Sequence, residues 1–380
     1  MKNIRTLIAA AAALLATGQA LADITTGVSI SLTGPTSALG IPTKNGIELW
    51  PKSIAGEKLN VIVLDDATDP TLGVKNARRF ITEDKVDVIV GSVATPIAAA
   101  MSDVATEGQT VQLMLSPVNL PEGKGAWSFR MPQSTAVMAI PIVDQWKKLG
   151  VKTFGFLGYA DAYGEAWLKD IVPVAEKAGI KMVATEHFAR ADTSVTGQAL
   201  KLVAGNPDAI LVVASGSGAA MPHKGLVERG YAKGKIYQTH GAASFDLIRV
   251  GGADVEGSYV VSGPAVVAPK LPDSNASKVL GVKYVTDYEK AYGKGMANQF
   301  GAHAFDVVIV LEKAIPLALK KARPGTKEFR SALKDALETM GRTPVSQGVL
   351  NFTATDHFGY TAETGVLLKI VGGEWQVVPN

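Results

Sequence analysis

The sequence predicts an α/β protein of two doubly wound parallel-sheet lobes, joined by a hinge of three chain crossings. Two observations lead to this prediction. Short runs rich in β-branched residues alternate with amphipathic helical stretches, a pattern typical of parallel sheets with helices on both faces. The chain also has 380 residues, 47% of them hydrophobic, which is enough to form two sizeable cores.

Nine apolar runs predict the strands of the two sheets. They are Ile24–Leu32, Leu59–Leu64, Val86–Val90, Val111–Leu115, Thr153–Leu157, Lys181–Ala184, Ala209–Ala214, Ile236–Thr239 and Ser258–Val261. Helical patterns lie between them, such as Leu72–Glu83, Ser134–Leu149, Glu165–Ala178 and Gly218–Arg229.

The alternation changes character near Ser262. Three helices and then two β segments are predicted beyond it, over Asn275–Tyr292, Gly301–Lys321, Thr326–Met340, Gly348–Phe352 and Val366–Val378. The last segment is expected to fold back as a hairpin at Gly372-Gly373, because type I′ and II′ turns need positive φ.

Proline and glycine residues suit linkers at three places where the chain is expected to cross between lobes. These crossings are Met131–Ser134, Ser262–Pro264 and Arg342–Gln347. They divide the chain into a first lobe of residues 23–132 plus 264–344 and a second lobe of residues 133–263 plus 345–380.

The first 22 residues have the pattern of a cleavable secretory signal. Lys2 and Arg5 precede the short apolar run Leu7–Ala16, and the small residues of Ala20-Leu21-Ala22 predict cleavage after Ala22. The alternative is a retained anchor helix, but the uncharged stretch is shorter than the roughly 20 apolar residues that span a bilayer. We therefore expect a periplasmic protein.

Composition excludes several kinds of site. The chain has no cysteine, and hence no disulfide, no thiolate zinc site, no cysteine nucleophile and no lipid attached to cysteine. Its formal net charge of +3 falls to +1 when Lys2 and Arg5 leave with the signal. A nearly neutral protein has no electrostatic footprint for nucleic acid or an anionic membrane.

Loops rich in glycine, serine and threonine follow six of the predicted strands. They are residues 31–35, 91–96, 116–119, 158–164, 215–218 and 239–244. Ligands of open parallel sheets bind outside the carboxyl ends of the strands, where backbone N–H groups and helix dipoles favour an anion. The alternative is that these residues are ordinary N-caps and tight turns.

Enzyme and metal motifs are mostly missing from the sequence. It has no P-loop and no Gly-x-Ser-x-Gly elbow, and Met221 stands where a dinucleotide fingerprint needs its third glycine. The five histidines lack metal-binding spacing, and Asp65, Asp66 and Asp69 lack the pattern of a calcium loop. We expect a binding protein with no cofactor, no metal and no catalytic constellation.

Several motifs in order along the chain carry a family resemblance. They are Ile30–Gly40 (ISLTGPTSALG), Asp65-Asp66, Ile89–Ser92, Leu115–Pro117, Asp161–Gly164, Gly257 and Ala304–Asp306. Together they resemble branched-chain-amino-acid-type solute-binding proteins of ABC importers, over essentially the whole mature chain. The resemblance implies a type I periplasmic binding protein fold whose lobes close on a small ligand, and a monomer that delivers this ligand to a membrane permease.

The same resemblance implies which side chains contact the ligand. These are Ser92, Thr95, Ser116 and Asn119 on one lobe, Tyr163, Ser217 and His240 on the other, and Phe300 from the segment after Ser262. The hydroxyl, amide and N–H groups of the first lobe would bind a carboxylate.

Two departures from the amino-acid receptors of this family indicate a different ligand. The loop Thr239–Ala243 carries His240 and no acidic residue to pair with an ammonium group, and Leu39 stands where an aromatic residue is frequent. An unpaired buried ammonium costs several kcal/mol. We therefore expect an aromatic acid, such as a benzoate or hydroxycinnamate, with a branched-chain amino acid or aliphatic amide as the alternative. An exported enzyme and a chemosensory ligand-presenting protein are alternatives of another class.

Overall fold

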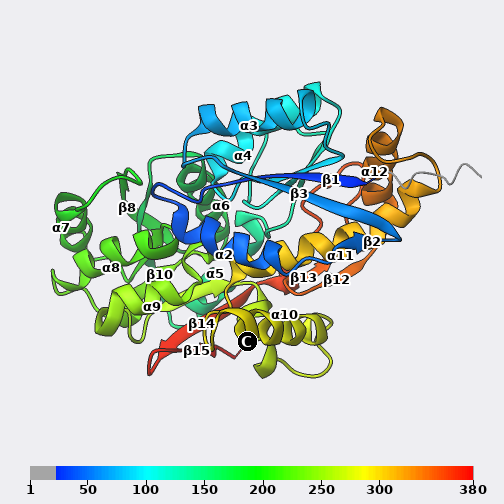
Figure 1. The fold of residues 1–380 in the computed structure, drawn as a ribbon. Coiled ribbons are helices and arrows are strands. Elements are labelled where there is room, and N and C mark those ends of the chain that lie inside the picture. Colours follow the sequence, from blue (N-terminus) through cyan, green and yellow to red (C-terminus); the bar gives the residue numbers. More distant parts are fainter. Residues whose placement is uncertain (1–22, 380) are drawn as a thin grey trace, which may run out of the picture.

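The computed structural model describes residues 23–379, so the predicted signal peptide and its cleavage site lie outside the described residues. Figure 1 shows two lobes, each built around a sheet, with the later helices α11 and α12 packed beside the first strands. Within residues 23–379, no helix combines the length and apolar character that crossing a bilayer requires. The predicted two-lobed parallel α/β architecture is confirmed.

The first lobe has a six-stranded sheet with a parallel core. In spatial order its strands are β2 (Ser53–Ile54), β3 (Glu57–Asp65), β1 (Ile24–Ile30), β4 (Val88–Gly91), β5 (Val111–Met114) and β6 (Ser128–Arg130). Only β2, at the edge, runs antiparallel to its neighbour. All residues of β4 and β5 are buried, as expected for parallel strands that helices cover on both faces.

Helices from distant parts of the chain cover the two faces of this sheet. Helices α3 (Pro70–Thr82) and α4 (Thr95–Glu107) bury Phe80 and Met101 against one face. The other face is covered by α2 (Ser37–Glu48), α11 (Gln299–Leu319) and α12 (Lys327–Thr339). The C-terminal helices thus complete the N-terminal sheet.

The second lobe has a seven-stranded sheet. In spatial order its strands are β15 (Glu374–Val377), β14 (Val366–Val371), β11 (Tyr259–Ser262), β10 (Ile236–Gln238), β9 (Ala209–Val213), β7 (Thr153–Tyr159) and β8 (Lys181–Phe188). Helices α5 (Thr135–Lys148), α6 (Ala162–Lys177), α7 (Thr196–Ala204), α8 (Ala220–Val227) and α9 (Phe245–Gly251) contribute to its core. Strands β14 and β15 form the predicted hairpin, with positive φ at Gly372 and Gly373.

The segments that connect the lobes meet at a polar cluster. Gln133 donates from Nε2 to the carbonyl of Gln347 over 2.6 Å. Both side chains lie against Gly263, where a Cβ would come 2.1 Å from Gln347 Oε1 and 2.8 Å from Gln133 Nε2. Gly263 therefore leaves room for two glutamines at the hinge.

The third crossing lies later than the sequence predicts. Residues 342–347 include β12 (Thr343–Val345), which pairs with β13 (Gly348–Leu350). Phe352 and Tyr360 are still buried in the core of the first sheet, and the chain reaches the second sheet only at β14. The reason is that β12 and β13 pair locally instead of joining the second sheet. The other predicted boundaries stay predictions.

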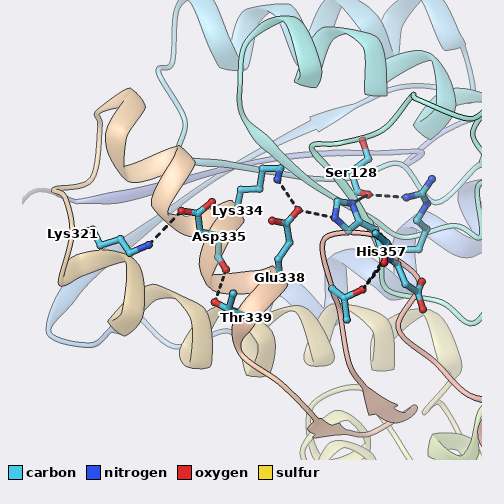
Figure 2. Close-up of polar contacts among 11 residues, drawn as sticks. Ser128, Lys321, Lys334, Asp335, Glu338, Thr339 and His357 are labelled. Carbon is cyan, nitrogen blue, oxygen red and sulfur yellow. Dashed lines mark hydrogen bonds and ion pairs between the residues drawn. The ribbon is translucent and has the colours of Figure 1, made fainter.

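A histidine fastens this late segment to the first lobe (Figure 2). His357 lies between Ser128 and Glu338, with Nδ1 3.1 Å from the Ser128 carbonyl and Nε2 3.0 Å from Glu338 Oε1. Its ring stacks on Phe129 at a centroid distance of 3.9 Å. Lys334 donates to the same Glu338 oxygen over 2.6 Å, so α12 holds the segment through one carboxylate.

Candidate functional site

A cavity lies between the lobes, at the carboxyl ends of the strands of both sheets, and its empty space is about 350 Å³ when the open solvent at its mouth is included. This is where open parallel sheets place their ligands. It is lined by Leu39, Val93, Thr95, Leu115, Ser116, Pro117, Pro132, Tyr163, Arg190, Ser215, His240, Gly241, Gln299, Phe300 and His303.

Five of the eight predicted site residues line this cavity, and each is almost fully buried. They are Thr95, Ser116, Tyr163, His240 and Phe300. Thr95 is the first residue of α4, so the positive end of that helix lies at the cavity wall. The structure thus brings strand-end residues of both lobes together.

The other three predicted residues lie elsewhere. Ser92 is buried below the cavity wall, where its hydroxyl donates to Asp66 Oδ2 over 2.7 Å. Asn119 lies on the exposed rim and donates to Asp170 of the opposite lobe over 3.3 Å. Ser217 lines a groove on the outside of the second lobe, and Ser215, two residues earlier, lines the cavity instead.

The hydroxyl of Ser116 is already engaged within the protein. It donates to the carbonyl of Ser92 over 3.2 Å. Of the three side chains predicted to bind a carboxylate, two are therefore engaged elsewhere. The hydroxyl of Ser92 lies behind the wall and donates to Asp66, and that of Ser116 donates to a backbone oxygen, which leaves Thr95.

Tyr163 is held by the start of helix α6. The Asp161 carboxylate caps this helix by accepting from the N–H groups of Tyr163 at 2.9 Å and Gly164 at 3.3 Å. The phenol donates to Thr239 Oγ1 over 2.9 Å and accepts from the N–H of Gly241 over 3.1 Å. Burial raises the pKa of Tyr163 to about 12, so the phenol is neutral at physiological pH.

Arg190 is a cavity residue that the sequence did not reveal. Its Nε donates to Asp161 Oδ2 over 2.6 Å, and its Nη1 donates to Ser215 Oγ over 3.0 Å. The guanidinium also lies over the ring of Tyr159, 4.1 Å from its centroid. The predicted strand Lys181–Ala184 stops short of the observed β8, which ends at Phe188, and this error hid the strand-end position of Arg190.

Two histidines that are distant in sequence line the same cavity. His240 follows β10, and His303 lies in the first turns of α11. Each is 2% exposed, and none of their four ring nitrogens has a hydrogen-bond partner among the described residues. Burial lowers the pKa of His240 to about 3, and burial together with the nearby His240 lowers that of His303 to about 3, so both rings are neutral at physiological pH.

The start of α11 sets the position of the remaining wall. Asn298 caps this helix by accepting from the N–H groups of Phe300 and Gly301, both at 3.0 Å. Gln299 donates from Nε2 to the carbonyl of His240, which joins the two lobes inside the cavity. The adjacent motif Ala304–Asp306 was part of the family resemblance, but the position of His303 in the cavity was not predicted.

The side chains that line the cavity include a cation but no carboxylate among the described residues. Arg190 is the one permanently charged side chain among the described lining residues, and none of these is an aspartate or glutamate. In residues 23–379 no group of three or more metal-binding side chains comes together. Nor does a hydrogen bond join a lining serine to a lining histidine in this part of the chain.

Known proteins with the same architecture span nearly all of this chain. The model of the periplasmic binding protein family matches residues 23–369. An extracellular ligand-binding receptor from Rhodopseudomonas palustris HaA2 is 47% identical with a TM-score of 0.92, over 94% of this chain and 100% of that chain. A Leu/Ile/Val-binding protein of Rhizobium johnstonii is 26% identical over 93% of this chain and 94% of its own length.

A more distant structure shows likeness of fold alone. It is a solute-binding protein of an ABC transporter from R. palustris in complex with benzoate, with 16% identity and a TM-score of 0.77 over 94% of this chain and 95% of that chain. The family match covers almost every described residue, and the receptor from strain HaA2 is similar over its whole length. This chain therefore belongs to the periplasmic binding protein family.

Proposed function

We propose that this protein is a periplasmic receptor for a small aromatic carboxylate, which it delivers to the permease of an ABC importer by closing its two lobes. The observation that carries the proposal is the charge of the cavity wall. Arg190, whose Nε binds Asp161, brings a guanidinium to this wall, and no described lining residue supplies a carboxylate.

The carboxylate of the ligand is proposed to bind Arg190 and Ser215. Arg190 presents a fork of donors whose remaining N–H groups suit a carboxylate. Ser215 Oγ accepts from Arg190 and so keeps its own hydroxyl proton to donate. This pair replaces the predicted contacts of Ser92 and Ser116.

The wall around these polar groups is suited to an aromatic ring. Leu39, Val93 and Leu115 supply apolar surface, while Tyr163 and Phe300 supply aromatic faces. An aromatic pair contributes about 0.5–1.5 kcal/mol beyond the burial of its area. Micromolar affinity needs about 8 kcal/mol in total, to which the burial of apolar area, the ring contacts and one charge-assisted pair all contribute.

A branched-chain amino acid is the second candidate, because a named Leu/Ile/Val-binding protein is similar over 93% of the chain. Its ammonium group would lack a carboxylate partner. Asp161 lies nearby, but Oδ2 binds Arg190 and Oδ1 caps α6. An unpaired ammonium in this cavity would cost several kcal/mol.

A thermal-shift and calorimetry series on the mature protein tests the proposal. Benzoate and cinnamate are compared with leucine, isoleucine and valine. We expect the aromatic acids to raise the melting temperature by about 5 °C at 100 times their Kd, and the amino acids to leave it unchanged. Stabilisation by the amino acids alone would overturn the proposal.

A further inference from the structure

The two buried histidines of the cavity use none of their hydrogen-bonding capacity within the described protein. A neutral imidazole has one N–H donor and one acceptor nitrogen. His240 and His303 together therefore have two donor and two acceptor nitrogens, and none of the four has a partner among the described residues. Buried polar groups in native proteins are almost always paired, so a group absent from the protein itself is expected to pair with these.

The surroundings of this pair are uncharged. The ring of His240 lies 5.9 Å from that of Tyr163 and 5.6 Å from that of Trp167, measured between centroids. Gln299, on the same helix as His303, lines the same cavity, and its Oε1 also lacks a partner among the described residues. The one charged lining side chain among the described residues, Arg190, bonds to Asp161 and Ser215 and makes no hydrogen bond to either histidine.

The order of the strands places the backbones of His240 and Arg190 at different strand ends of the second sheet. Across the second sheet the strands run β10, β9, β7, β8, so His240 follows one outer strand of this group and Arg190 follows the other. Three strand spacings separate their starting points by about 14 Å. The Arg190 side chain folds back to Ser215, at the end of β9, so the guanidinium itself approaches the strand next to β10.

We propose that His240 and His303 form a subsite for a hydroxyl group on the aromatic ligand, separate from the Arg190–Ser215 pair in the same cavity. The inference rests on the proposed function and adds the substituent that the receptor selects. A hydroxyl donates once and accepts, so it takes the acceptor nitrogen of one imidazole and the N–H of the other. An unsubstituted ring leaves both nitrogens unpaired, and a site built to bind a hydroxyl rejects the analogue that lacks it for this reason.

Calorimetry with matched ligand pairs tests the subsite. The probes are 4-hydroxybenzoate against benzoate, and 4-hydroxycinnamate against cinnamate. We expect the wild-type protein to bind each hydroxylated acid about 10- to 100-fold more tightly than its partner. A ratio near one, with both acids bound, overturns the subsite and leaves the proposed function standing, whereas failure of every aromatic acid to bind overturns the proposed function.

Variants of the histidines separate the subsite from a general effect of removing a buried ring. His303→Leu and His240→Leu are expected to bring the hydroxyl preference close to one. His223→Leu is the control, because His223 is also buried but has Nε2 on the Asp254 carbonyl and Nδ1 near Gln238, away from the cavity. The readout is a ratio within each variant, so a loss of stability does not imitate the result. Equal loss of the preference in all three variants contradicts the proposal.

Terephthalate tests whether the histidines bind a second carboxylate instead. That ligand would draw protons onto the imidazoles, so its affinity would rise as the pH falls from 8 to 5.5. For 4-hydroxybenzoate we expect an affinity that changes little over this range, because both imidazoles are neutral and no described lining residue is acidic. Burial raises the pKa of Asp306, one turn from His303 on α11, to about 7, but its carboxyl binds the N–H groups of Ser346 and Gln347 and does not line the cavity. Tighter binding of terephthalate, increasing at low pH, overturns the assignment of a hydroxyl.

Discussion

Arg190 donates from Nε to Asp161 Oδ2 over 2.6 Å, and the same carboxylate caps helix α6 through Oδ1. One aspartate therefore positions both the cation of the cavity and the helix that carries Tyr163. The guanidinium is held by three contacts, to Asp161, Ser215 and the face of Tyr159. Binding a carboxylate there requires little further ordering of the arginine.

Arg190→Ala is expected to weaken benzoate binding by about 10- to 100-fold, because a hydrogen bond to a charged group contributes about 1.5–3 kcal/mol. Calorimetry on the mature protein measures this loss. Arg190→Lys keeps the charge without the fork of donors, so its affinity for benzoate should lie between those of the wild type and Arg190→Ala. Unchanged affinity in Arg190→Ala would instead place the carboxylate at the Thr95 end of the cavity.

Gly216→Ala is expected to hinder lobe closure and lower ligand affinity by about tenfold, equivalent to about 1.4 kcal/mol. Gly216 lies on the second lobe with φ of +54°, and a Cβ there would come 2.9 Å from both Ala38 Cβ and Leu39 Cδ1 of the first lobe. Gly252→Ala is the matched control, because Gly252 has the same φ of +54° and no atom within 4 Å of its Cβ position. Equal affinities of the two variants would contradict the role of this contact in closure.

Asp306 should make the folding stability fall as pH rises from about 4 to 7. Burial raises the pKa of Asp306 to about 7, against an ordinary value of 3.8, although it accepts from the N–H groups of Ser346 and Gln347. The folded state thus binds more protons than the unfolded state in this range. The contribution of Asp306 to the free energy of unfolding is therefore complete below the ordinary pKa of 3.8 and is lost as the pH rises through the folded-state pKa of about 7. The slope is at most about 1.4 kcal/mol per pH unit.

Urea unfolding of the wild type and Asp306→Asn at pH 5 and pH 8 measures this effect. The difference in unfolding free energy, wild type minus variant, should shrink as the pH rises, because the asparagine does not titrate. A difference that stays constant with pH would show that the carboxyl has the same pKa in the folded and unfolded states.

His357→Ala is expected to lower the free energy of unfolding by about 2–4 kcal/mol, because it removes a buried ring that stacks on Phe129 and bonds Glu338. Chemical denaturation measures the loss, and ligand affinity should not change. Lys321→Ala breaks the exposed pair with Asp335 beside the same helix (Figure 2), and should cost less than about 1 kcal/mol. Equal effects of the two variants would contradict a structural role for His357.

Much of the fold was readable from periodicity, since buried parallel strands and amphipathic helices impose different repeats on the sequence. The hairpin at Gly372-Gly373 was predicted because the turn needs positive φ, which both residues adopt. Strand ends were predicted less well. Residues 185–188 lack the apolar run of a central strand, because β8 is at the edge of the sheet and is half exposed, and this hid Arg190.

The sequence by itself determined the two-lobed parallel architecture, the loops at the strand ends, and the lack of an acidic residue beside His240. Each of these depends on local pattern and residue type. Only the tertiary structure decided which side chains of those loops line the cavity. Ser215 lines it whereas Ser217 lies outside, and His303 joins His240 from the other end of the chain. These outcomes depend on how the two lobes meet, and no local stretch of sequence encodes that geometry.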